Sequence, residues 1–242
     1  MRASTETTGH DEARHAPAVA IVLAAGAGRR VGAEEPKAFL PIGGRPVLAV
    51  AAGAAAASPA VASLIVTAPA GWEERAIGCL EGCGVPVAVV TGGVTRQASV
   101  RAALESVPPA TSVVAIHDAA RPFAPPDLFT AVIAAVSERT PGVVPVAPVT
   151  DTVKQVVDGR VVGTLDRERL ALAQTPQAFD LAVLRAAHSR AAESGIAMTD
   201  DAVALERGGI AVAAIAGDPN NVKITTLFDL VNADARMGGS GG

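Results

Sequence analysis

The sequence is poor in aromatic residues, which account for 2% of its 242 residues, and it contains no tyrosine. Half of the residues are hydrophobic, and alanine dominates this fraction. A chain of this length and hydrophobicity can bury a large core. We therefore expect the close contacts between helices and sheet in that core to rest on small side chains.

Cysteine is also scarce, and the two cysteines, Cys79 and Cys83, lie four positions apart. Without a second pair they match neither a zinc signature nor a disulfide framework, so we interpret them as reduced thiols of a cytoplasmic protein. The chain has 24 acidic and 20 basic residues, and its net charge of −4 argues against a surface that coats nucleic acid. A bound anion would need a local cluster of basic residues.

The two ends of the chain lack the patterns of folded elements. Residues 1–17 are polar and mixed in charge, which predicts a disordered N-terminal extension rather than a signal peptide. Residues 237–242 end in Gly-Gly-Ser-Gly-Gly and predict a flexible tail. We expect a single domain over residues 18–236 between them.

One stretch without charge, between Arg45 and Glu73, is long enough to span a bilayer. Alanine and glycine supply much of it, and Ser58-Pro59 interrupts it. We therefore expect a buried helix followed by a strand here, and no membrane span.

Short β-rich runs alternate with helical patterns along the chain. We predict strands at 18–24, 61–67, 85–90, 112–117, 142–147 and 210–216. We predict helices near 46–57, 72–82, 96–106, 126–139, 180–193, 200–208 and 226–235. The near-continuous apolar strands indicate a mostly parallel sheet covered on both faces. The pattern is that of a doubly wound, Rossmann-like α/β fold, which binds ligands at the carboxyl ends of its strands.

The segment at about 149–166 interrupts this alternation, because two β-branched runs flank Asp158-Gly159. An Asp-Gly pair in this position is a strong signal for a two-residue hairpin, which we expect to project from the sheet as an arm. Exposed valines would make such an arm prone to aggregation unless it is covered. A second copy of the arm is the simplest cover, so we predict a homodimer formed through the hairpin.

The first candidate binding element follows the strand that ends at Leu23. A turn of small residues comes directly after it and leads into two arginines, with Lys37 seven positions further on; the residues of interest are Ala24, Ala25, Gly26, Gly28, Arg29, Arg30 and Lys37. A glycine-rich turn beside clustered cations is how α/β proteins hold a phosphate chain. The spacing fits neither the dinucleotide fingerprint nor the Walker loop. A plain strand-to-helix turn with solvated surface cations is the alternative interpretation.

Two further turns follow predicted strands. Gly92 and Gly93 precede a helix that carries Ser99 near its start, and their backbone groups would suit the edge of a base. The alternative is an ordinary turn in which Thr95 caps the helix. Asp118 stands at the end of another strand, three residues before Arg121, where it could hold a magnesium ion or accept a hydrogen bond from a substrate hydroxyl. An internal ion pair between these two residues is the competing interpretation.

Taken together and in order, these motifs closely resemble the 2-C-methyl-D-erythritol 4-phosphate cytidylyltransferase family. The resemblance runs from about residue 18 to 230 and rests on LAAGAGRR, PKAFL, GGVTRQASV, VAIHDAARP, PVTDTVK, QTPQAF, TDDAVALE and NNVKIT. It implies a nucleotidyltransferase fold that uses CTP, a polyol phosphate and Mg²⁺ in the non-mevalonate route to isoprenoids. One departure is Val94, which stands where this family often has aspartate, so a side-chain contact to the base from that position is lost.

The resemblance also implies roles for particular residues. Those expected to stabilise the transition state or hold the reacting groups are Arg30, Lys37, Arg167 and Lys223. Those expected to bind CTP are Ala24, Ala25, Gly26, Gly28, Arg29, Gly92, Gly93, Ser99 and Ala119. Those expected to bind the polyol phosphate are Asp118, Arg121, Thr152 and Thr175. The resemblance implies that Thr152 and Arg167 lie on or near the arm of the partner subunit, which would make the site composite.

Three other functions are alternatives to this one. A cytidylyltransferase acting on ribitol 5-phosphate is the nearest alternative, and the arm and TDDAVALE favour methylerythritol phosphate over it. A nucleotide-binding protein without activity would not need cations at both substrates, and the presence of Arg30, Lys37, Arg167 and Lys223 together argues against it. A NAD-dependent oxidoreductase is disfavoured by the spacing of the glycines.

Overall fold

The first strand, β1 (Ala18–Leu23), lies inside the central sheet and is buried on both faces in the computed structural model, which describes residues 18–26, 35–193 and 198–238. Its side chains alternate between two hydrophobic clusters: Ala18, Ala20 and Val22 point to one, and Val19 and Ile21 to the other. This alternation follows from the two-residue period of a strand. A strand that contributes to two cores has to lie between two layers of helices.

The central sheet has eight strands. They are β1, β4 (Val61–Ala68), β5 (Val87–Thr91), β6 (Val113–Asp118), β7 (Gly142–Pro148), β10 (Ala171–Ala173), β11 (Gln177–Asp180) and β12 (Val212–Ala216). Their order is β10-β7-β11-β6-β1-β4-β5, and β12 pairs with β7. The pairs of β1 with β4 and β6, β4 with β5, and β7 with β12 are parallel. The predicted mostly parallel sheet is confirmed, with β10 and β11 as its antiparallel members.

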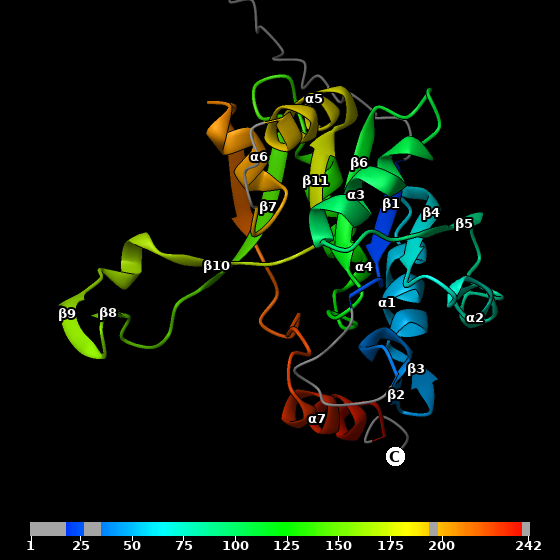
Figure 1. Cartoon of the computed structure of the whole chain (residues 1–242), viewed down its shortest axis with the longest axis horizontal. Coiled ribbons are helices and arrows are strands. Elements are labelled where there is room, and N and C mark those ends of the chain that lie inside the picture. Colours follow the sequence, from blue (N-terminus) through cyan, green and yellow to red (C-terminus); the bar gives the residue numbers. More distant parts are fainter. Residues whose placement is uncertain (1–17, 27–34, 194–197, 239–242) are drawn as a thin grey trace, which may run out of the picture.

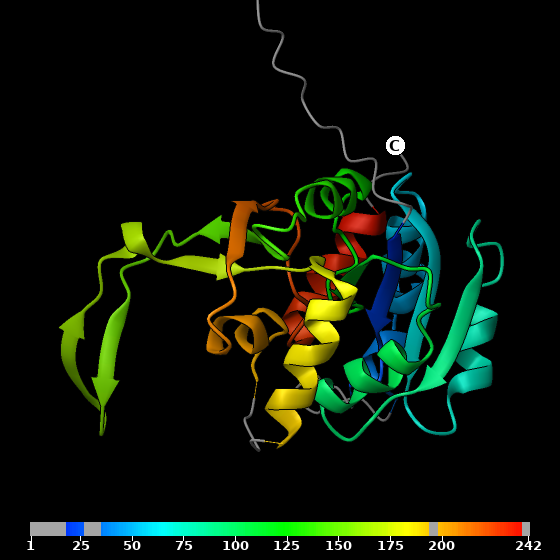
Figure 2. The same ribbon diagram turned by 90° about the horizontal axis from the view of Figure 1, so that it is seen from above.

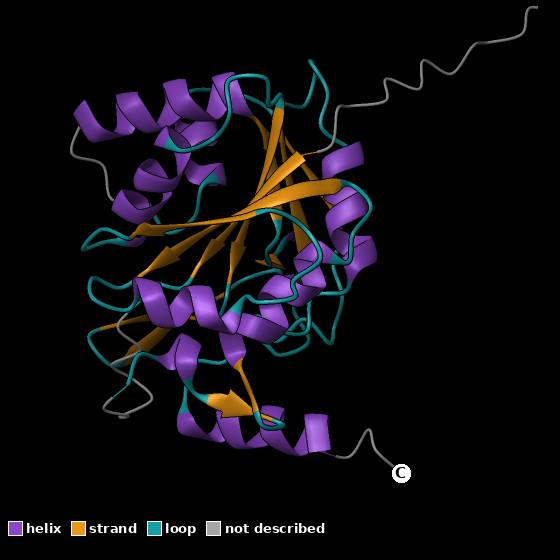
Figure 3. Cartoon of the chain, turned by 90° about the vertical axis from the view of Figure 1, so that its right-hand side faces the viewer, coloured by secondary structure: helices purple, strands orange, loops and turns teal. Residues whose placement is uncertain are grey.

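Helices cover both faces of this sheet, as Figure 3 shows. One face packs against α1 (Val47–Ala56), α2 (Glu73–Cys79) and α4 (Pro126–Ala134), and the other against α3 (Arg96–Glu105), α5 (Leu181–Glu193) and α6 (Ala202–Arg207). The helix predicted over 126–139 ends at Ala134, because Ser137 and Thr140 form a hydrogen-bonded turn with Oγ and Oγ1 2.8 Å apart. Among the described residues, none of the helices has the length and apolar character needed to cross a bilayer.

A small third cluster joins the C-terminal helix α7 (Leu227–Gly238) to the hairpin of β2 (Pro41–Ile42) and β3 (Arg45–Pro46). Ile42, Ile224 and Ala233 are buried in it, and Met237 packs against it. Because of this contact, α7 continues to Gly238, so the first two residues of the expected flexible tail are helical. The rest of that tail, and the expected extension over residues 1–17, lie outside the described residues.

The predicted arm is present. Strands β8 (Lys154–Val157) and β9 (Arg160–Thr164) form a separate hairpin that projects from the body of the molecule, as Figures 1 and 2 show. Asp158 and Gly159 have positive φ angles of 48° and 75°, as the expected two-residue turn requires. Four valines of the arm are each more than half exposed, namely Val156, Val157, Val161 and Val162. The single chain therefore has the exposed apolar surface from which the homodimer was predicted.

Candidate active site

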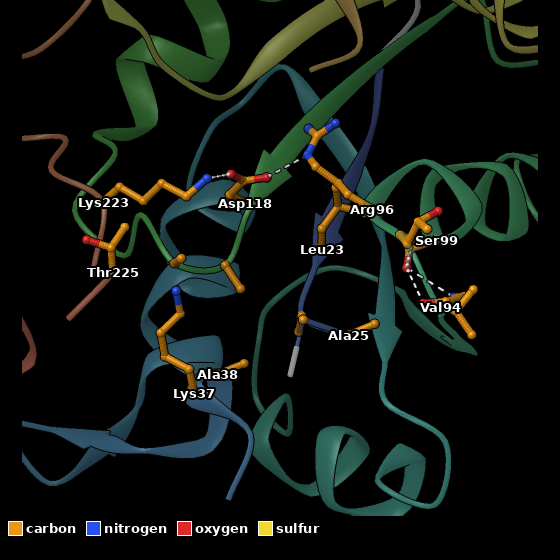
Figure 4. A pocket seen from close by; sticks show the side chains of 16 residues that line it. Leu23, Ala25, Lys37, Ala38, Val94, Arg96, Ser99, Asp118, Lys223 and Thr225 are labelled. Atoms are coloured by element: carbon orange, nitrogen blue, oxygen red, sulfur yellow. Dashed lines mark hydrogen bonds and ion pairs between the residues drawn. The ribbon is translucent and has the colours of Figure 1, made fainter. Parts of the chain in front are cut away.

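A cavity of about 660 Å³ opens at the carboxyl ends of the parallel strands (Figure 4). Its volume is within the range of sites that bind small molecules. Leu23 and Asp118, the last residues of β1 and β6, lie on its wall, as a doubly wound fold requires. The lining residues are Leu23, Ala24, Ala25, Gly26, Lys37, Ala38, Gly93, Val94, Thr95, Arg96, Ser99, Asp118, Ala119, Ala120, Lys223 and Thr225.

The predicted phosphate-binding turn forms one side of this cavity. Ala24, Ala25 and Gly26 lie on its wall, and the backbone N–H of Ala24 donates to Thr67 O over 2.9 Å, which fixes the start of the turn. Lys37 reaches the same cavity from the 3-10 turn Lys37–Phe39. Gly28, Arg29 and Arg30 lie outside the described residues, so their predicted roles stay predictions.

The predicted base-binding turn lies next to the phosphate-binding turn. Ser99 Oγ accepts from the Gly93 N–H over 3.0 Å, and the Gly92 N–H donates to Ala68 O over 2.8 Å. Both N–H groups are thus used inside the protein, and a contact between cytosine and these residues stays a prediction. Thr95 does cap α3, since its Oγ1 accepts from the Ala98 N–H over 3.0 Å. Val94 is fully exposed on the cavity wall, with a side chain that offers no hydrogen bond.

The packing explains why glycine is needed at this turn. A Cβ on Gly92 would lie 2.2 Å from Ala25 Cβ, and one on Gly93 would lie 2.3 Å from Ala98 Cβ. Real carbon atoms do not approach so closely, so a larger residue would push the two turns apart. The base-side and phosphate-side turns therefore support each other through contact of Gly92 with Ala25.

Asp118 stands between two cations on the third side of the cavity. Its Oδ1 lies 3.2 Å from Arg96 Nε, and its Oδ2 lies 2.6 Å from Lys223 Nζ. Burial alone would raise the pKa of the Asp118 carboxyl, but Arg96 and Lys223 outweigh burial and hold this pKa well below its usual range. Asp118 is therefore ionised at neutral pH and can accept a hydrogen bond from a ligand. Asp118 thus forms ion pairs with Arg96 and Lys223, and not with Arg121 as the alternative interpretation expected.

The backbone of Asp118 is also held in place. Its N–H donates to Thr175 Oγ1 over 3.0 Å, and Thr175 Oγ1 is 3.1 Å from His117 Nδ1. His117 Nε2 lies 3.0 Å from the Arg121 carbonyl, which can only accept, so Nε2 carries the hydrogen and Thr175 donates to Nδ1. Burial lowers the pKa of His117 to about 4, which agrees with a neutral ring at pH 7. Thr175 is buried in this structure, and its predicted contact with substrate stays a prediction.

The sequence that forms this cavity also matches a known protein family over nearly all of the described chain. The family model described as "IspD: 2-C-methyl-D-erythritol 4-phosphate cytidylyltransferase" matches residues 18–239. The chain belongs to this cytidylyltransferase family. The resemblance inferred from the motifs is thereby confirmed.

Individual relatives of this family are similar over most of their length. The 2-C-methyl-D-erythritol 4-phosphate cytidylyltransferase of Saccharopolyspora erythraea is 46% identical over 221 residues, which cover 90% of this chain and 97% of the relative. That of Streptomyces coelicolor is 43% identical over 227 residues, covering 89% and 83%. The crystal structure of the enzyme of the same name from Thermus thermophilus superposes with a TM-score of 0.75 at 36% identity, covering 91% of this chain and 98% of that one.

Five of the described residues with roles implied by the family resemblance are absent from the cavity wall of the single chain, namely Gly92, Arg121, Thr152, Arg167 and Thr175. Arg121 Nη1 and Nη2 donate to the carbonyls of Asn221 (2.7 Å) and Ala173 (3.1 Å), so the guanidinium ties loops together behind the site. Thr152 and Arg167 flank the β8–β9 hairpin, and Arg167 Nη1 donates to Thr150 O over 2.6 Å. Their roles as substrate contacts stay predictions.

The cavity wall offers few side chains that could bind Mg²⁺. Asp118 is the one carboxylate among the described residues of the cavity wall, and both of its oxygens are paired with cations. Within the described part of the chain, no group of three or more His, Cys, Asp or Glu side chains is placed to hold a metal ion. The described residues therefore fit a magnesium ion that is held mainly by substrate phosphates and water, with Asp118 as the carboxylate that could contribute a ligand.

Arg96 is the residue of the site to which the sequence analysis gave no role. It is the first residue of α3, and it lines the cavity while pairing with Asp118. Burial would lower the pKa of Arg96, but Asp201 and Asp118 raise it above its ordinary value, so the guanidinium is always charged. A cation at a helix N-terminus is unfavourable for the helix dipole, and this was the signal in the sequence that could have pointed to Arg96.

Proposed function

We propose that this chain transfers the cytidylyl group of CTP to 2-C-methyl-D-erythritol 4-phosphate. The products are 4-diphosphocytidyl-2-C-methyl-D-erythritol and pyrophosphate, in the synthesis of isoprenoid precursors. The observation that carries the proposal is one cavity that brings Lys37, Asp118 and Lys223 together in a chain of this family.

The chemistry asks for placement and charge neutralisation. An oxygen of the acceptor phosphate forms a bond to the α-phosphorus of CTP, and the bond from that phosphorus to the oxygen bridging to the β-phosphate breaks. The electron pair of the broken bond stays with pyrophosphate, and no proton has to be removed from the attacking phosphate. The protein therefore has to align two polyanions and stabilise the negative charge between them.

Two sides of the cavity suit the two anions. The turn of Ala24 to Gly26, with Lys37 beside it, would hold the triphosphate, and the family pattern adds Gly28, Arg29 and Arg30 to this group. The ammonium of Lys223, which lines the same cavity, would bind the acceptor phosphate. The ionised Asp118 carboxylate, 2.6 Å from Lys223 Nζ, would accept a hydrogen bond from a hydroxyl of the polyol.

We also propose Mg²⁺ as the cofactor, bound through the phosphates with Asp118 as its available carboxylate. A bound magnesium ion would neutralise triphosphate charge and favour the departure of pyrophosphate. Ala119, which lines the cavity beside Asp118, would contact the ribose or base of CTP, and Ser99 with the Gly92–Gly93 turn would hold the base.

The working unit is proposed to be a homodimer joined through the arm. The exposed valines of the arm need a cover. Thr152 lies just before β8 and Arg167 just after β9, and neither residue lines the cavity of its own chain. A partner subunit whose arm reaches this cavity would satisfy both. Cys79 and Cys83 are free thiols, which together with the use of CTP supports a cytoplasmic location.

The test is a pyrophosphate-release assay on the purified chain with CTP, Mg²⁺ and a panel of polyol phosphates. We expect methylerythritol phosphate to give the highest kcat/KM, ribitol 5-phosphate a much lower one, and chelation of Mg²⁺ to stop the reaction. Binding of CTP without pyrophosphate release from any acceptor would reject the proposal. Light scattering at micromolar concentration should give the mass of a dimer, and a monomer would reject the composite site.

A further inference from the structure

A row of four charged side chains runs from the cavity wall into the protein interior. Lys223 Nζ lies 2.6 Å from Asp118 Oδ2, and Asp118 Oδ1 lies 3.2 Å from Arg96 Nε. These first three residues are seen side by side in Figure 4. Arg96 Nη1 then lies 2.7 Å from Oδ2 of Asp201, the residue that precedes α6. The row thus joins the end of β6 to the starts of α3 and α6.

The inner end of the row is fully enclosed. Asp201 has no exposed surface, and its Oδ1 lies 3.1 Å from Nε2 of His188, which is also buried. An ionised carboxylate at such depth is unfavourable unless it is paired, so Asp201 depends on Arg96 and His188. Arg96 in turn starts a helix, where a cation is disfavoured unless carboxylates compensate it. The Arg96–Asp201 pair is therefore held together from both sides.

This pair determines where the Arg96 guanidinium can point. The group is planar and its N–H bonds have fixed directions, so a partner at Nη1 constrains the direction of Nε. Nε is the atom that faces Asp118, and Asp118 in turn holds Lys223 with its second oxygen. A change at Asp201 should therefore reach the cavity through Arg96, although Asp201 is absent from the cavity wall.

We propose that Asp201 is a positioning residue of the active site, which acts through Arg96 to fix the carboxylate of Asp118 and thereby the ammonium of Lys223. This inference rests on the proposed function, since the positioned groups are those that would hold the acceptor phosphate. It assigns a role in the reaction to a buried carboxylate that does not line the cavity.

The chain supplies a matched control in the neighbouring residue. Asp200 Oδ1 accepts from the Val203 N–H over 3.2 Å, and its Oδ2 accepts from Gln177 Nε2 over 3.0 Å. Asp200 therefore supports the same start of α6 as Asp201, but its hydrogen bonds lead to α6 and β11. Asp200→Asn removes the same charge from the same segment and leaves the Arg96–Asp201 pair in place.

The experiment compares Asp201→Asn with Asp200→Asn, and repeats Asp201→Asn in an Asp118→Asn background. Steady-state pyrophosphate release is measured per folded molecule, with folding checked by circular dichroism. Asp201→Asn should lower kcat roughly tenfold or more, as small misplacements of reacting groups do, and Asp200→Asn should stay within about twofold of the wild type. In the Asp118→Asn background, Asp201→Asn should lower kcat by less than about twofold, because the carboxylate that Asp201 positions is already absent.

Other results overturn the proposal. Equal kcat for the Asp200 and Asp201 variants, or the same fold-loss in both backgrounds, would mean that Asp201 only supports the fold. If Asp201→Asn does not fold, His188→Gln takes its place in the same comparison, since it removes the second partner of Asp201 and leaves its charge. A wild-type chain that releases no pyrophosphate rejects the proposed function itself, which distinguishes the two failures.

Discussion

Lys37 donates a hydrogen bond from Nζ to the backbone carbonyl of Ile224, 187 positions later in the chain, over 2.5 Å. Ile224 directly follows Lys223, so this bond connects the two segments that carry the lysines of the cavity wall. The Ile224 N–H donates to Ala120 O over 2.8 Å, which adds the segment after β6. Three loops that are far apart in sequence are therefore joined at one point beside the proposed reaction.

Replacing Lys37 tests whether its ammonium group contributes to catalysis. Lys37→Ala should lower kcat by about 10² or more, because an ammonium placed at the triphosphate stabilises the transition state more than the ground state. The thermal melting temperature should stay close to that of the wild type. Arg139→Ala, at an exposed position outside the cavity, is the control and should leave turnover unchanged. Full turnover in Lys37→Ala would remove Lys37 from the mechanism.

The segment that carries Lys223 is held by a capping box at the start of α7. Asp229 Oδ2 accepts from the Thr225 N–H (2.8 Å), the Thr225 hydroxyl (2.7 Å) and the Thr226 N–H (2.8 Å), and the Asp229 N–H donates to Thr226 Oγ1 over 3.2 Å. Asp229→Ala should cost about 1 kcal/mol of stability. For a protein of this size, that corresponds to a melting temperature lower by about 2–4 °C, measurable by calorimetry.

The same carboxylate predicts a pH dependence. The hydrogen bond from the Thr225 side chain, followed by that from its backbone, lowers the pKa of Asp229 to about 2 from an ordinary value of 3.8. A group with a lowered folded-state pKa stabilises fully above its unfolded pKa, and this contribution is lost as the pH falls toward the folded value. The difference in unfolding free energy between wild type and Asp229→Ala should thus be constant from pH 7 to 5 and narrow toward pH 3. A difference that widens on acidification would contradict this assignment.

Contact between the two turns at Gly92 gives a prediction about packing. Gly92→Ala would place a methyl group 2.2 Å from Ala25 Cβ and 3.0 Å from Ser99 Oγ, so the turns must separate. We expect a loss of about 1–3 kcal/mol in stability and weaker CTP binding by calorimetry. Gly78→Ala is the matched control, because a Cβ there meets nothing within 4 Å and Gly78 lies within α2. That variant should be neutral or slightly stabilising, and equal behaviour of the two variants would refute the contact.

The parts of this protein that follow from local patterns could be predicted. The strand that ends at Leu23 and the two-residue hairpin turn at Asp158-Gly159 depend on residues adjacent in sequence, and both are present. By contrast, β11 was missed, because it has four residues and follows Pro176. Its place between β6 and β7 depends on partners that the segment itself does not reveal.

The site shows the same limit. Lys37, Asp118 and Lys223 were identified from motifs, and the cavity contains all three. The role of Arg96 depends on Asp201, which is 105 positions later in the chain, and no local pattern joins them. Likewise, Gly92 is needed because of Ala25, which lies on another turn. Relations of this kind become visible only when the fold brings the residues together.

The composite site can be tested with subunits that each lack one residue. Lys37 lies on the cavity wall, whereas Arg167 follows the arm and does not line the cavity of its own chain, so a site built from both would draw them from different chains. A hybrid dimer of one Lys37→Ala and one Arg167→Ala subunit, purified through two different affinity tags, then has one site that lacks both residues and one intact site. It should show about half of the wild-type rate, although each parent homodimer is nearly inactive. If both residues act within one chain, every site of the hybrid lacks one of them, and the hybrid should be as inactive as its parents.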